Sequence, residues 1–175
     1  MQIREELEVV LKTVNSVVVN LENTILRTKE VKDEKTISLI SRIVDFLRRM
    51  ESVILQISSM LDTAGGNVVL LAPYTYVFRT ESELVFLRSK PEHVIISINF
   101  AKSSISIKVR HGSLTITPST MEVRARGLSF QIDFKSFDAF REKRDEIGSI
   151  MRIFEKTLYR RIVPFVEQLA KTVKK

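Results

Sequence analysis

The stretch SISIKVRHGSLTITPSTMEVRARGLSFQIDF, residues 104–134, decides the fold of this chain of 175 residues. Apolar and polar residues alternate along it with a period of two, which predicts strands that are buried on one face only. Short turn sequences interrupt the alternation at His111-Gly112, Thr117-Pro-Ser-Thr120 and Arg126-Gly127. Strands joined by loops this short are antiparallel neighbours. The stretch therefore predicts an antiparallel meander with one apolar face.

The turns also predict which residues lie opposite each other, because the loop length sets the register of a hairpin. The predicted pairs are Ile98 with Ile105, Val109 with Leu114, Ile116 with Met121, and Val123 with Phe130. On the polar face, this register predicts one row of Arg110, Ser113, Arg124 and Ser129, and a second row of Lys108, Thr115, Glu122 and Gln131.

The strands expected before this stretch differ from it, because they are apolar on both faces. They are residues 68–71, 84–87 and 94–96, next to an aromatic row of Tyr74, Tyr76 and Phe78. A strand with two apolar faces needs cover on both sides of the sheet. We therefore predict that Val85, Leu87 and Ile95 form an interaction surface, covered by the helices or by a second subunit. A second copy of the chain, forming a homodimer, is the favoured partner. The predicted sheet has about seven strands.

Residues 1–63 show helical periodicity. Apolar residues are spaced alternately three and four apart in both halves, which predicts an antiparallel hairpin of helices over residues 2–30 and 36–63. Asp33 is a plausible N-cap of the second helix, and Gly65-Gly66 ends it. The hairpin either packs on residues 64–175, which form the sheet and the C-terminal helix, or protrudes as a coiled-coil arm. Further apolar positions outside the stripes favour packing.

Residues 136–173 return to helical period and predict a long C-terminal helix. Ser136 or Asp138 caps its start, and Pro164 kinks or divides it. The fold class is therefore α+β: an N-terminal helical hairpin, an antiparallel meander sheet and a long C-terminal helix. This order is similar to a helix-grip layout, in which a curved sheet wraps a long helix around an apolar cavity. The similarity is one of topology, covers residues 37–173 and implies no function. A carrier that holds an apolar ligand between the sheet and the long helix is a separate hypothesis, which a cavity lined by Tyr74, Tyr76, Phe78 and Phe154 would favour.

The composition and motifs offer little for catalysis. The chain has no cysteine and two histidines, His93 and His111, which are expected at a strand start and in a turn. No glycine-rich phosphate loop occurs. Acidic residues early in the C-terminal helix suit the helix dipole. We therefore predict a protein that is not an enzyme, with no catalytic residues, no metal site and no cofactor.

The net charge of +7 is unevenly distributed. Residues 1–63 carry −1, whereas residues 64–135 and 136–175 carry +4 each. Affinity for a polyanion would therefore lie in the sheet or the C-terminal helix. The candidate nucleic-acid-binding residues on the sheet are Lys108, Arg110, Arg124 and Arg126. A plainly solvated sheet face is the alternative interpretation, because the polar face lacks aromatic side chains on which bases could stack.

Three functions follow as hypotheses. The first is a non-catalytic interaction or assembly protein that acts through long amphipathic helices and an apolar sheet end. The second is a nucleic-acid-associated protein without sequence preference, and the third is the apolar-ligand carrier. The acidic, amphipathic start of the chain and the lack of a long apolar run predict a cytoplasmic protein with no membrane partner. The composition also fits a thermophile.

Overall fold

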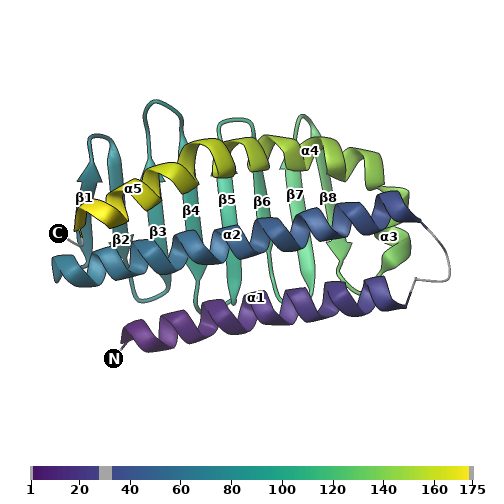
Figure 1. Ribbon diagram of the computed structural model, residues 1–175, viewed down its shortest axis with the longest axis horizontal. Coiled ribbons are helices and arrows are strands. Elements are labelled where there is room, and N and C mark those ends of the chain that lie inside the picture. Colours follow the sequence, from purple (N-terminus) through teal and green to yellow (C-terminus); the bar gives the residue numbers. More distant parts are fainter. Residues whose placement is uncertain (1, 28–32, 174–175) are drawn as a thin grey trace.

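The computed structural model describes residues 2–27 and 33–173. Two helices come first, α1 (Gln2–Leu26) and α2 (Glu34–Ala64), and they lie antiparallel (Figure 1). The predicted helix end at residues 28–30 falls outside the described residues. Asp33 caps α2, because its side chain accepts a hydrogen bond from the Thr36 backbone N–H at 3.1 Å. Gly65 ends α2 in the left-handed conformation, with φ of 76°.

An eight-stranded antiparallel sheet follows, in which each strand pairs with the next strand along the chain. The strands are β1 (Val68–Ala72), β2 (Thr75–Arg79), β3 (Glu83–Arg88), β4 (Val94–Asn99), β5 (Ser104–Val109), β6 (Gly112–Ile116), β7 (Thr120–Ala125) and β8 (Leu128–Asp133). The predicted meander is confirmed, with one strand more than the seven expected.

The register agrees with three of the four predicted pairs. The confirmed pairs are Ile98 with Ile105, Ile116 with Met121, and Val123 with Phe130. The fourth pair is wrong, because Val109 lies opposite Gly112, and Leu114 lies opposite Ile107. The shift is two residues, so every side chain of β6 still points to the predicted face of the sheet.

Gly112 accounts for the shift. Gly112 was predicted to lie in the turn, but the turn consists of Arg110 and His111, and Gly112 begins β6. A Cβ atom at Gly112 would lie 2.9 Å from the Cβ of Ala125 and 3.4 Å from the ring of Phe154. The glycine therefore permits β6 to approach both the neighbouring strand β7 and helix α4 closely, and it does not serve the turn.

The C-terminal helix is broken into pieces. They are α3 (Phe137–Glu142), α4 (Arg144–Thr157), the π-helical turn η1 (Leu158–Ile162) and α5 (Val163–Val173). Ser136 caps α3, because its hydroxyl accepts from the Ala139 N–H at 3.2 Å. The division expected at Pro164 takes the form of η1, where the Val163 N–H donates to the Leu158 carbonyl five residues back. Proline lacks an N–H and crowds the preceding turn, which a wider π turn accommodates.

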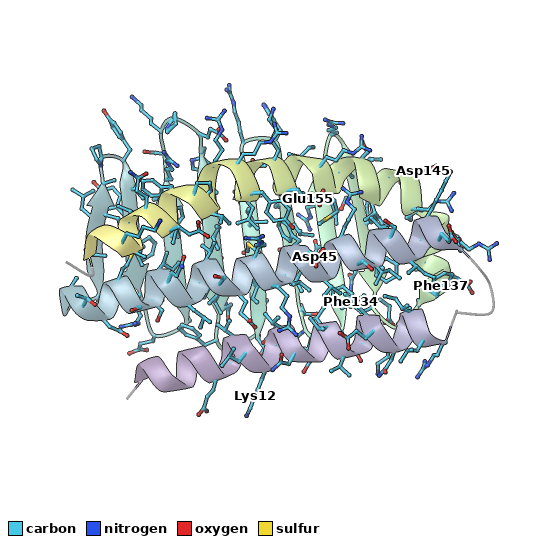
Figure 2. The ribbon with its side chains drawn as sticks, in the orientation of Figure 1. Lys12, Asp45, Phe134, Phe137, Asp145 and Glu155 are labelled. Atoms are coloured by element: carbon cyan, nitrogen blue, oxygen red, sulfur yellow. The ribbon has the colours of Figure 1, made fainter. Side chains whose placement is uncertain are left out.

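The long helices all lie on one face of the sheet, with α2 between α1 and the α4–α5 segment (Figure 1). We call this the covered face. It shares one core with the helices, in which the largest fully buried side chains are Phe46, Phe86, Phe134, Phe140 and Phe154. Figure 2 shows Phe134 in the strip between α1 and α2. The apolar stripes of α1 and α2 belong to this core, since Val14, Leu47 and Ile54 are almost completely buried.

Candidate interaction surfaces

The opposite face of the sheet carries none of the described helices (Figure 1), and we call it the open face. Two rows of side chains cross it from β1 to β8. The first row is Leu70, Tyr76, Leu87, Ile95, Lys108, Ser113, Arg124 and Ser129. The second row is Val68, Phe78, Val85, Ser97, Ser106, Thr115, Glu122 and Gln131. Both rows change from apolar to polar near the middle of the sheet.

The apolar end of the open face consists of Val68, Leu70, Tyr76, Phe78, Val85, Leu87 and Ile95. Val68 is 65% exposed, Leu70 58% and Tyr76 43%. The predicted interaction residues come together here: Val85 is 6% exposed, and Leu87 and Ile95 are half-buried. The helices do not cover these residues, because the helices lie on the other face. The apolar end is therefore a candidate contact surface.

The polar end of the open face, on β5–β8, contains two of the four predicted nucleic-acid-binding residues, Lys108 and Arg124. Lys108 takes the place in the row that was predicted for Arg110, which is a consequence of the shifted β5–β6 register. Arg124 forms an exposed ion pair with Glu122 at 2.9 Å. The negative charges of Glu122 and Asp133 balance the positive charges of Lys108 and Arg124, so this end of the open face carries little net charge.

The other two predicted cations, Arg110 and Arg126, lie in hairpin turns. These turns are at the strand ends along which α4 and η1 run (Figure 1). A groove of about 620 Å³ lies between α4–η1 and two loops, the β7–β8 turn with Arg126 and the β3–β4 loop with Glu92, and Arg110 is not part of its lining. Its lining consists of Glu92, Arg126, Ser149, Arg152, Ile153, Lys156, Thr157 and Arg161. The sequence analysis missed Arg152 and Lys156, although their spacing of four residues on a helix was a usable signal.

The helix layer contains a second polar region, between α2 and the α4–η1 segment. Arg42 of α2 forms an ion pair with Glu155 of α4 and donates to the Gly148 carbonyl at 3.3 Å. Figure 2 places Asp45 and Glu155 on facing helices here. The nearby Tyr159 hydroxyl is buried without a hydrogen-bond partner. Burial, followed by the charges of Glu155 and Asp45, raises the pKa of Tyr159 to about 12. The Arg42–Glu155 ion pair therefore links α2 to α4.

The aromatic residues expected around a ligand cavity do not share one. Tyr76 and Phe78 point to the open face, whereas Phe154 is fully buried between α4 and the covered face. Tyr74 lies in the turn before β2. In the part of the chain that the structure describes, no helix is long and apolar enough to span a bilayer. Within the same residues, no group of three or more histidine or acidic side chains is arranged to hold a metal ion.

Comparisons of this chain with protein-family models, with curated proteins and with solved structures find no match.

Proposed function

We propose that the protein is a non-catalytic assembly protein that binds a second copy of itself through the apolar end of the open face, and that it acts in the cytoplasm. The observation that carries the proposal is the exposure of Val68, Leu70 and Tyr76 on a sheet whose other face is already covered. The apolar stripes of α1 and α2 are buried in the protein's own core and are therefore not free to bind a partner. The proposed contact is made by the sheet alone.

A second copy is the partner that the chemistry of this surface fits best. A dimer with two-fold symmetry brings the same patch of both subunits together, so the patch must complement itself. An apolar strip satisfies this condition, because apolar side chains meet apolar side chains whichever way the axis is placed. The two sheets would then pack face to face about 10 Å apart, as in a β-sandwich.

The size of the apolar end sets the expected strength of this contact. Four strands about 4.8 Å apart and about 17 Å long give a patch of roughly 300 Å² in projection. A stable interface buries about 800 Å² on each partner. We therefore expect a weak dimer that dissociates on dilution.

Sedimentation equilibrium over a wide range of protein concentration tests the proposal. The wild type should shift from the monomer mass of 20.2 kDa towards twice that value. Leu70→Glu should remain a monomer, because it places a charge inside the contact. Ser129→Glu is the matched control, because Ser129 lies in the same row on the other edge strand, β8. A wild type that stays monomeric throughout, or equal weakening by both variants, contradicts the proposal.

A further inference from the structure

The groove between α4–η1 and the hairpin turns gathers positive charge that the proposed dimer does not use. Its lining contains four cations, Arg126, Arg152, Lys156 and Arg161, and one acid, Glu92. Arg161 pairs with Glu92 at 2.7 Å. Within the described ranges 2–27 and 33–173, the other three cations form no ion pair. The groove therefore keeps an unneutralised charge close to +3.

The fold brings these cations to one place from distant parts of the chain. Arg152 and Lys156 lie one helical turn apart, which separates them by about 6 Å along the axis. Arg161 follows Lys156 by five residues and would point to another side of a regular α-helix. The π turn of η1 is wider, about one turn per four to five residues, and keeps Arg161 beside the groove. Arg126 closes the groove from the β7–β8 turn, where its φ is 52°.

Three further cations lie outside the groove lining, on the same row of hairpin loops or next to Arg161 in the sequence. Lys90 and Arg110 lie in the two neighbouring hairpin loops, and Arg160 is exposed next to Arg161. Successive hairpin loops at one edge are two strands apart, which is about 10 Å. The positive charge thus follows a line, as the phosphates of an extended polyanion do, and does not converge on a single point.

We propose that this groove binds the phosphate backbone of duplex DNA without sequence preference. Single-strand binders stack bases on aromatic side chains, and the groove lining contains none. Proteins recognise duplex RNA by its A-form shape together with contacts to phosphates and 2′-hydroxyls. The lining has two hydroxyl side chains, Ser149 and Thr157, and Thr157 already donates to the Ile153 carbonyl at 3.2 Å. Cations that contact phosphates position a protein on DNA and do not select a sequence.

Fluorescence polarisation with a labelled 20-base-pair DNA duplex tests this site. Non-specific binders have dissociation constants on the order of 10⁻⁶ to 10⁻⁴ M at physiological salt, and binding tightens as salt is lowered. Arg152→Ala combined with Lys156→Ala should weaken binding at 50 mM salt by at least about tenfold and reduce the log–log salt slope by about 1.8. Both side chains are exposed, so the fold should survive, which circular dichroism checks.

Lys12→Ala combined with Lys135→Ala is the matched control, because it removes the same charge from exposed positions outside the groove. Figure 2 shows Lys12 on the outer side of α1. The control should keep the wild-type slope. The proposal is overturned by equal weakening in both double variants, by tighter binding of a single strand or an RNA duplex of the same sequence, or by no binding below about 100 μM at 50 mM salt. The monomeric Leu70→Glu variant should retain the salt slope per chain, which separates this proposal from the dimer.

Discussion

The two ends of the open face have the same backbone and different side chains. Leu70 and Ser129 stand at opposite ends of one row, on the two edge strands, and the helices lie on the far side of the sheet. Antiparallel sheets are stable with one face in water, so the polar end needs no further layer. The apolar end carries side chains of the kind found in a core, but none of the described helices or strands covers them. The proposed dimer therefore uses the apolar end of the open face and leaves the polar end in water.

Substitutions in the core between the covered face and the helices should have the largest effects, because the side chains there are already fully enclosed. Ile54→Asp in α2 buries a charge without a partner and should lower the free energy of unfolding by about 3 kcal/mol or more. Val19→Asp is the control, because Val19 of α1 is half exposed and its replacement should cost less than about 0.5 kcal/mol. Denaturant titration measures both, and similar losses would contradict the assigned core.

Two neighbours on β3 compare the faces directly. Phe86 is buried on the covered face, and Leu87 is half-buried on the open face. Phe86→Ala should cost about 3–5 kcal/mol, whereas Leu87→Ala should cost about 1 kcal/mol in the monomer. Denaturant titrations at low and high protein concentration sharpen the comparison. The cost of Leu87→Ala should grow with concentration as the dimer forms, and an unchanged cost would argue that Leu87 lies outside the contact.

A smaller effect tests how well the helix layer excludes water near Tyr159. Its pKa of about 12 in the folded protein exceeds the value of about 10 expected after unfolding. The stability that this shift contributes is present below pH 10 and is lost as the pH rises towards 12. The wild type should therefore lose more stability over this window than Tyr159→Phe does, in denaturant titrations at each pH. Parallel losses would mean that water reaches the hydroxyl.

At neutral pH, Tyr159→Phe should change the free energy of unfolding by less than about 0.5 kcal/mol or stabilise the protein slightly. The reason is that the hydroxyl is buried without a hydrogen-bond partner, so its removal breaks no bond. A loss above about 1 kcal/mol would indicate a hydrogen bond to this hydroxyl.

Most of the fold could be predicted from the sequence, because period and turn length are local signals. The cap at Asp33, the end of α2 at Gly65 and the pair Val123–Phe130 all follow from them. The β5–β6 register could not be predicted, because a shift of two residues leaves apolar side chains opposite apolar side chains. In the observed register Gly112 stands where a side chain would crowd Ala125 of β7 and Phe154 of α4, and both residues are distant from the β5–β6 turn in the sequence.

The candidate surfaces were predictable to different degrees. Val85, Leu87 and Ile95 were found from strands that are apolar on both sides, although the sequence alone left helices and a second subunit as alternative covers. The groove was not found, because it joins Arg126 to cations of α4 and η1. The π turn that directs Arg161 towards it changes the helical phase in a way that a fixed period of 3.6 residues misses.

Distances between spin labels in the dimer test the central claim most directly. The chain has no cysteine, so Lys108→Cys and Lys12→Cys each provide a single labelling site. Lys108 lies on the open face beside the apolar end, and Lys12 lies on the outer side of α1. Face-to-face packing predicts double electron–electron resonance distances below about 30 Å between Lys108 labels and above about 40 Å between Lys12 labels. Lys12 labels that lie closer together than Lys108 labels, or no dipolar coupling at Lys108, would contradict the account.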